Sequence, residues 1–365
     1  MRTPALGGLA VLLVAAATST AAIADDRADT PLERGAFVAT PAVYDLISDQ
    51  RIDALIVDKR RVPVGRNVPI RGTAFGVAPG RVVAAQHVAA PSRQQLIEEI
   101  VAVAGLSGVT TDPARVRVVA RTPRTVSLMP PTAAVSGASP HPIAAQVKRR
   151  SSEVNDLVLL KIADLDAPTL ALNDALTRGT PAAVIGFGAQ PPAIAAVRLG
   201  TLDGPRLIKD TNNDGFGGFE GAVLGGDSGA PVVDAHGQAH GVVLRLRSDT
   251  APVIARAESV RALLEADGVS GGESAATADF RTAMAAFWRR DYGPAAASLK
   301  RLRDANPAGA FVRHEYERAT ALVAADYALR RPSRTRGAVL AFGAMAAVCA
   351  AALGALRIRR QPFLP

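Results

Sequence analysis

Residues 66–268 alternate short runs of β-branched and small apolar residues with turns rich in Gly, Pro and Asp. This alternation is typical of many short strands joined by tight turns, so it predicts a mainly β fold. We expect strands at 73–77, 81–85, 115–120, 157–162, 182–186, 231–233 and 239–244. A chain of 365 residues is long enough to form a sizeable hydrophobic core. Its single cysteine excludes an intrachain disulfide and a multi-cysteine zinc site.

Two apolar segments flank this strand-rich section. A basic start, an apolar run and the sequence Ala22-Ile23-Ala24 predict a secretory signal over residues 1–24, with an uncleaved anchor as the alternative. Residues 337–356 are uncharged, and as a helix they would span about 30 Å, the thickness of the bilayer hydrocarbon. We therefore expect a transmembrane helix there, rather than a buried core helix, followed by a cytoplasmic tail at 357–365.

The basic residues gather beside the predicted transmembrane helix. The formal net charge is +9, but seven arginines lie between 330 and 365 with no acidic residue among them. Residues 25–329 are left near neutrality, so the charge belongs to a membrane flank and a role in nucleic-acid binding loses its support. Signal and span together predict a single-pass protein of the cell membrane, with the section between them outside the cytoplasm.

The remaining segments complete the predicted domain organisation. Residues 25–65 form an N-terminal segment and a candidate propeptide, and 269–277 form a Gly-rich linker. Residues 278–329 have helical spacing, with Phe280, Met284, Phe287 and Trp288 on one stripe. This part resembles a tetratricopeptide-like helix pair followed by one more helix; a plain helical spacer is the alternative.

Three short segments of the strand-rich section carry the residue types of nucleophilic catalysis. His87 follows the strand-like run Val82–Ala85, Asp156 precedes the apolar run Leu157–Ile162, and Ser228 lies in a Gly-rich turn. A serine hydroxyl is a poor nucleophile unless a base removes its proton, and a carboxylate can fix the tautomer of that base. Glycines permit a tight turn that aims backbone N–H groups at one point, where they stabilise developing negative charge.

In the order His, Asp, Ser, these segments resemble the trypsin-like serine proteases, in particular the disulfide-free bacterial HtrA-type branch. The family's Ala-Ala-His-Val, "DLAVLKI" and "G-[ND]-S-G-G-P" motifs are similar to residues 82–88, 156–162 and 226–231. The resemblance implies two antiparallel β-barrels with the site in the cleft between them. It also implies that no metal or organic cofactor takes part.

The same resemblance assigns roles to individual residues. His87 would be the general base, Asp156 its orienting carboxylate and Ser228 the nucleophile. The N–H groups of Gly226 and Ser228 would form the oxyanion hole. We expect the substrate pocket to be formed by four small or aliphatic residues, Ala222, Val242, Val243 and Leu244. Such a pocket favours substrates with a small or aliphatic residue before the scissile bond.

Some features depart from the family pattern. Gln86 stands where alanine is usual before the histidine, and residues 91–150 form a long insertion between the histidine and aspartate segments. Asp210, Asn212, Asp214 and Gly215 match the start of an EF-hand loop, but position 221 is glycine where the closing acid should be. We therefore expect a polar surface turn there, with no metal.

The sequence thus predicts a membrane-anchored extracytoplasmic serine endopeptidase that acts on protein or peptide substrates. The alternative is a catalytically inactive, protease-like adaptor that binds proteins at the cell surface. The Gln86 change or a cleft blocked by the insertion would favour the adaptor. Native substrate and oligomeric state stay open.

Overall fold

The computed structural model describes residues 28, 30–57, 59–92, 96–97, 116–120, 125–131, 141–152, 155–164, 166–188, 195–206, 216–244, 252–306 and 309–330. The predicted signal, the 337–356 span, the 210–215 loop and much of the 91–150 insertion lie outside these residues. Within them, no helix is both long and apolar enough to cross a bilayer.

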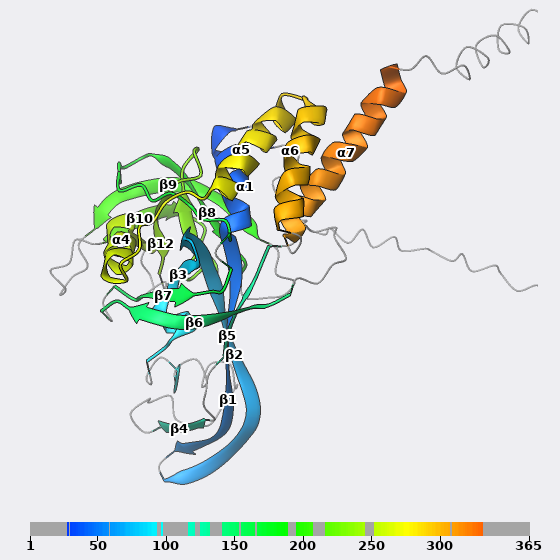
Figure 1. Ribbon diagram of the computed structural model, residues 1–365. Coiled ribbons are helices and arrows are strands. Elements are labelled where there is room, and N and C mark those ends of the chain that lie inside the picture. The colour runs from blue at the N-terminus through cyan, green and yellow to red at the C-terminus, as the bar shows by residue number, and fades with distance from the viewer. Residues whose placement is uncertain are drawn as a thin grey trace, which may run out of the picture.

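The first sheet contains seven antiparallel strands: β1 (Val43–Val57), β2 (Arg60–Ala78), β3 (Arg81–Ala85), β4 (Val116–Ala120), β5 (Thr125–Met129), β6 (Ile143–Arg150) and β7 (Leu157–Lys161). They run in the order β2-β3-β7-β6-β5-β1, and the pairing of β1 with β2 closes this ring into a barrel. β4 pairs with the far end of β1, outside the ring. Figure 1 shows β1 and β2 continuing well beyond the barrel as one long hairpin.

The second sheet is a closed antiparallel barrel of six strands: β8 (Pro181–Gly186), β9 (Ala196–Arg206), β10 (Phe216–Gly221), β11 (Pro231–Val233), β12 (Ala239–Val243) and β13 (Val253–Arg256). The prediction of a mainly β chain with two antiparallel barrels is confirmed.

The boundary predicted between residues 65 and 66 falls inside β2. β1 pairs with β2 continuously from Val43 opposite Phe75 to Val57 opposite Arg60, apart from one bulge. Residues 43–65 are therefore strands of the first sheet, and their removal as part of a propeptide would open the barrel. Burial alternates along β1 over residues 46–54, but the buried positions include the polar residues Ser48 and Gln50. The hydrophobic alternation that marks a half-exposed strand is therefore missing from the sequence of 44–57.

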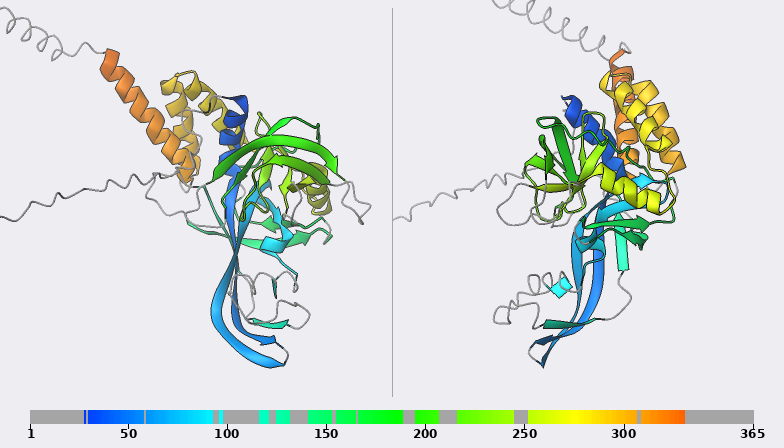
Figure 2. Two further views of the ribbon diagram at one scale, coloured as in Figure 1. Left: turned by 180° about the vertical axis from the view of Figure 1, so that it is seen from behind. Right: turned by 90° about the vertical axis from the view of Figure 1, so that its left-hand side faces the viewer.

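The helices are α1 (Pro31–Ala39), η1 (Thr40–Ala42), α2 (Gln86–Ala89), α4 (Ala257–Ala266), α5 (Ala275–Trp288), α6 (Tyr292–Ala305) and α7 (Ala310–Arg330). α1 starts with a capping box, in which the Thr30 side chain accepts from the Glu33 N–H and the Glu33 carboxylate accepts from the Thr30 N–H. α5, α6 and α7 lie together beside the second barrel, and α7 points away from both barrels (Figure 2).

An aromatic cluster joins the helices to the barrels. Phe37 of α1 stacks on Phe280 of α5 with centroids 6.1 Å apart and contacts Phe311 of α7 at 5.2 Å. Ahead of α5, the Gly272 N–H donates to Val77 of β2, and Thr169 accepts at its carbonyl from Thr277. The last residues of the linker expected at 269–277 are therefore helical, since α5 begins at Ala275, and Gly272 and Thr277 bond this segment to the barrel section.

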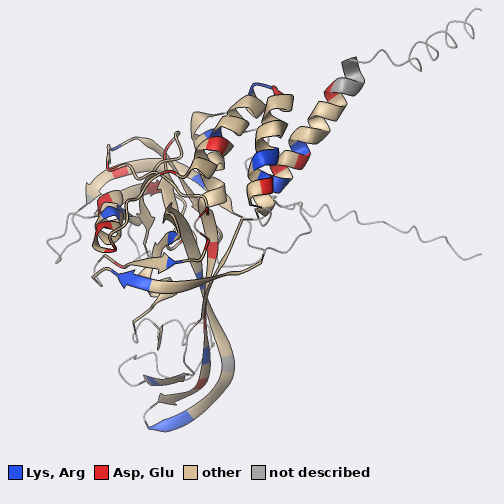
Figure 3. Ribbon diagram, viewed as in Figure 1, with Lys and Arg blue, Asp and Glu red and all other residues tan. Residues whose placement is uncertain are grey.

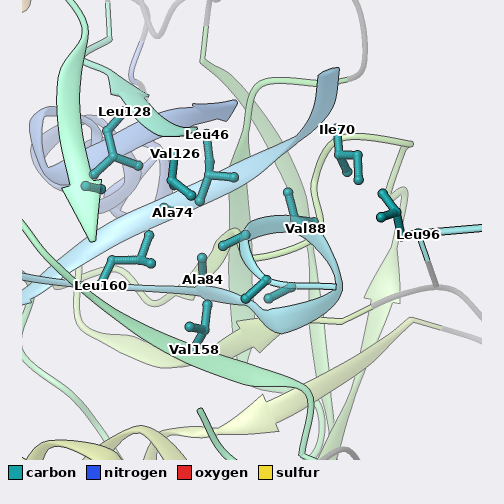
Figure 4. Packing of buried hydrophobic residues seen from close by; sticks show 14 of the residues in the cluster. Leu46, Ile70, Ala74, Ala84, Val88, Leu96, Val126, Leu128, Val158 and Leu160 are labelled. Carbon is teal, nitrogen blue, oxygen red and sulfur yellow. The ribbon is translucent and has the colours of Figure 1, made fainter. Parts of the chain in front are cut away.

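The strands β3 and β7 are apolar on both faces because they lie between two cores. Val158 and Leu160 point into the first barrel (Figure 4), whereas Leu157 and Leu159 join the cluster shared with the second barrel. Val83 of β3 belongs to that shared cluster as well. This double burial explains the uninterrupted apolar run after Asp156.

Asp45 of β1 is buried, with a side chain only 1% exposed. Its Oδ2 lies 3.3 Å from Arg71, while Oδ1 has no hydrogen-bond partner in the described part of the chain. Burial raises the pKa of Asp45 from 3.8 to about 6, although the Arg71 charge acts in the opposite direction. Between these two values the folded chain holds more protons than the unfolded chain, so this group's contribution to stability falls as pH rises through 6.

We predict that Asp45→Asn gains stability relative to the unsubstituted chain as pH rises from 5 to 8. Asn carries no charge to bury, so it avoids the cost of ionising Asp45. About one pKa unit of the shift is titrated between pH 5 and pH 8, so the expected gain is about 1.4 kcal/mol. Urea unfolding of the full chain at both pH values measures the difference, with Asp174→Asn on the exposed surface as control. A difference that is the same at pH 5 and pH 8 would contradict the prediction.

Candidate active site

The pairing of β3 with β7 brings two of the predicted site residues together. Ala85 lies opposite Leu157 in this ladder, so His87 and Asp156 emerge at the same edge of the barrel. The Gln86 N–H donates to the Asp156 carbonyl at 2.7 Å, which fixes α2 against the start of β7. Residues 69 positions apart in sequence are thereby placed side by side.

Asp156 binds His87 through both carboxylate oxygens. Oδ2 lies 2.5 Å from His87 Nδ1, and Oδ1 accepts the His87 backbone N–H at 2.9 Å. Because a carboxylate accepts hydrogen bonds, Nδ1 carries the ring proton and Nε2 keeps its lone pair. The His87 side chain is 6% exposed, so water competes little for this contact. The pair has the arrangement of a base with a fixed tautomer.

The backbone of Asp156 is strained, with φ at 48° in the left-handed region. A non-glycine residue adopts this conformation at a cost of about 1–2 kcal/mol, which surrounding contacts must offset. Here three hydrogen bonds to residues 86 and 87 supply those contacts. Backbone strain of this kind is common at functional sites, where a side chain must be held in one orientation.

Thr73 of β2 attaches the Ser228 loop to the first barrel. Its backbone N–H donates to the Ser228 carbonyl at 2.8 Å, and its hydroxyl donates to the Gly226 carbonyl at 2.9 Å. A side-chain carbon at Gly229 would lie 2.0 Å from the Thr73 carbonyl and 2.9 Å from the backbone nitrogen of Ala85. The serine turn thus packs directly on the strand that leads to His87, and only glycine fits at 229.

Two glycines of the serine turn have a positive φ, a backbone conformation that favours glycine. Gly226 has φ 93° and Gly229 has φ 92°. Within the described part of the chain, the N–H groups of Gly226 and Ser228 have no acceptor. Ser228 is half-buried, and its hydroxyl makes no hydrogen bond to a described residue, His87 included. The geometry leaves two backbone donors and one hydroxyl available at the same turn.

Asp227, between Gly226 and Ser228, is fully buried and ion-paired. Its Oδ1 accepts from Arg198 of β9 at 2.9 Å, and its Oδ2 accepts from the Leu224 N–H at 2.8 Å. Burial raises the pKa of Asp227, although the backbone bond from Leu224 and the Arg198 charge act in the opposite direction. Asp227 stands in the serine motif as a charged residue, but nothing in the sequence indicated Arg198 as its partner.

The predicted pocket residues lie in different environments. Val242 and Val243 of β12 are fully buried on opposite faces of the strand, in two separate core clusters, and Leu244 is 6% exposed. Ala222, after β10, is exposed. Val242 and Leu244 are therefore packed in the cluster shared by the two barrels, and Val243 is packed in a separate core cluster of the second barrel.

Two other buried polar side chains, His240 and Gln86, differ in their partners. His240 Nδ1 lies 2.5 Å from the Ala175 carbonyl and Nε2 lies 3.3 Å from Asp234, so this second His–Asp pair is buried and bonded on both ring nitrogens. Gln86 is 7% exposed, and its Oε1 has no partner within the described residues. Those residues contain no group of three His, Cys, Asp or Glu that could hold a metal ion.

Comparison with known sequences gives a match over the part of the chain that carries this geometry. Residues 72–242 match the family described as "Trypsin-like peptidase domain". The chain therefore contains a trypsin-like serine peptidase domain, whose two barrels extend beyond both ends of the matched residues. The matched segment includes Thr73, His87, Asp156 and the whole serine turn. No curated protein matches the chain.

Several solved protease structures are similar to the domain. The active form of the Rv3671c protease from M. tuberculosis is 20% identical, over 66% of this chain and 87% of that chain, with a TM-score of 0.43. The HtrA-type protease AlgW with a decapeptide is 17% identical over 64% and 66%, with a TM-score of 0.43. Deg5 is 14% identical over 65% and 97%, with a TM-score of 0.41.

We predict that Arg198→Leu destabilises the peptidase domain by about 3–5 kcal/mol, because it leaves the buried Asp227 carboxylate without its cation. The Asp227→Asn substitution removes that charge, so adding it to Arg198→Leu should regain more than half of the loss. Urea unfolding of the two single variants and the double variant measures the coupling. Costs that simply add would show that the two side chains are not coupled.

Proposed function

We propose that the chain is a membrane-anchored, extracytoplasmic serine endopeptidase of the HtrA-type branch, which cleaves protein or peptide substrates through an acyl-enzyme. The observation that carries this proposal is the contact of Asp156 with His87 beside a serine turn bonded to the same barrel. The serine peptidase class of residues 72–242 agrees with it.

In the proposed mechanism, Ser228 attacks the carbonyl carbon of the scissile peptide bond. His87 Nε2 takes the hydroxyl proton, because its Nδ1 is already committed to Asp156, and later gives that proton to the leaving amine. Asp156 stays ionised and stabilises the imidazolium that forms between these steps. Water then repeats the sequence on the acyl-enzyme and releases the second product. The Ser228 hydroxyl must rotate toward His87 when substrate binds, as is common at sites without ligand.

Negative charge develops on the carbonyl oxygen during each attack. The N–H groups of Gly226 and Ser228 are the proposed donors, and their lack of an acceptor within the described chain supports this role. Each donor of this kind contributes about 3–4 kcal/mol to transition-state stabilisation. The Arg198–Asp227 ion pair and the hydrogen bonds of Thr73 fix the conformation of the serine turn. The two N–H donors therefore need little rearrangement when negative charge develops on the carbonyl oxygen.

The proposed location rests on the chain's two apolar segments. α7 ends at Arg330, a few residues before the uncharged stretch 337–356 that we propose spans the membrane. With a cleaved signal at 1–24, the peptidase domain would lie outside the cytoplasm. For substrate choice we retain a small or aliphatic residue before the scissile bond, with Ala222 as the exposed member of the proposed pocket.

We predict that Asp156→Asn lowers kcat for peptide hydrolysis on the order of 10⁴-fold, because an amide N–H facing Nδ1 would favour the wrong tautomer. The matched control is Asp234→Asn, which alters the second His–Asp pair and should keep kcat within a few-fold. Equal losses in the two variants would show that the effect is structural, and would remove the assignment of Asp156.

A covalent label separates the peptidase from the adaptor alternative. We predict that a peptidyl phosphonate labels the full chain in membranes, that Ser228→Ala abolishes the label, and that His87→Ala strongly reduces it. Intact-protein mass spectrometry measures the adduct. An adaptor with a blocked cleft would take up no label that depends on Ser228.

A further inference from the structure

The tip of the β1–β2 hairpin carries a basic cluster, which is visible in blue at the lower end of Figure 3. We define the tip cluster as Lys59, Arg60, Arg61 and Arg117, all of which are exposed. Arg61 and Arg117 both lie opposite Ile56, on the two strands that flank β1, so they share one face of the tip. Arg60 lies opposite Val57, on the other face, and Lys59 is in the turn. The four cations therefore lie on both faces of the tip and in its turn, where the sequence also has one acidic residue, Asp58.

These four side chains have no acidic partner among the described residues. Elsewhere on the hairpin, Arg51 contacts Asp53 and Arg71 contacts Asp45. Residues 25–329 are close to neutral as a whole, so the tip cluster is a local concentration of charge rather than part of a generally basic surface. Such a concentration attracts anionic ligands and raises their rate of association.

The hairpin connects the tip cluster to the candidate site. β2 runs without interruption from Arg60 at the tip to Thr73, which bonds the Ser228 carbonyl. At about 3.3 Å per residue, this is about 40 Å along the strand. A polypeptide could touch both ends only if it were long, whereas a short peptide at Ser228 would not reach the tip.

The tip also faces away from the end of the chain that leads to the predicted membrane span. In both views of Figure 2, α7 leaves at one end of the molecule and the hairpin tip lies at the other. This arrangement favours a partner in the aqueous space over the anionic surface of the anchoring membrane. Since the neighbouring chemistry acts on peptide bonds, the partner that fits is a protein.

We infer that the tip cluster is an exosite that captures acidic segments of protein substrates and delivers them to the Ser228 site. This inference rests on the proposed function. It adds a requirement for substrate length and acidity that the catalytic residues alone do not impose.

The test compares Arg60→Gln/Arg61→Gln/Arg117→Gln with a control of equal charge change on the helices, Arg289→Gln/Arg290→Gln/Arg301→Gln, whose side chains are also exposed. We expect the tip variant to lose about tenfold in kcat/KM toward α-casein at low salt, through KM, and to keep its kcat/KM for a six-residue peptide within twofold. The control should match the unsubstituted chain on both substrates. High salt should remove the difference.

A binding measurement keeps the exosite testable apart from catalysis. In the Ser228→Ala chain, fluorescence anisotropy should detect poly-L-glutamate binding that the three tip substitutions weaken about tenfold. Unchanged poly-L-glutamate binding, unchanged casein cleavage, or equal losses on casein and the short peptide would each overturn the inference. So would a loss confined to binding of vesicles containing phosphatidylglycerol. If poly-L-glutamate binds at the tip but no peptide is hydrolysed, the proposed function fails and the tip remains an acidic-protein site.

Discussion

The Asp156 carboxylate holds His87 by its ring and by its backbone, and the chemistry proposed for this chain depends on that double contact. It exists because β3 and β7 are neighbours that are buried on both faces, between the core of the first barrel and the core shared with the second. A strand in that position cannot slip by one residue without moving its apolar side chains to the wrong core. Packing therefore fixes the register, and the register fixes the catalytic pair.

The second barrel is joined to this pair through buried polar groups. Thr73 bonds the carbonyls of Gly226 and Ser228, and Asp227 is held by Arg198 beneath the same turn. Buried ionic groups rarely add stability over apolar replacements, but losing one partner is costly. The Arg198–Asp227 pair therefore favours one conformation of the serine turn over the others. A single conformation keeps the N–H donors of the turn preorganised for the developing negative charge.

The sequence predicted the β-rich section and the three catalytic segments because each depends on local patterns. The Gly-Asp-Ser-Gly turn is specified by its own backbone requirements, and the apolar run after Asp156 by its burial. Sequence reasoning missed what depends on distant contacts. Nothing local pairs Arg198 with Asp227, and nothing local shows that β1 completes the first barrel or that Val242 and Val243 face two packed cores.

The central claim is that Ser228, His87 and Asp156 meet at one reacting centre. A crystal structure of the full chain inhibited by a peptidyl phosphonate tests it most directly. The account predicts phosphorus bonded to Ser228 Oγ, a phosphoryl oxygen within hydrogen-bond distance of the Gly226 N–H, and His87 still bonded to Asp156. An adduct on another residue, or a Ser228 adduct with His87 turned away and the Asp156 contact broken, would contradict it.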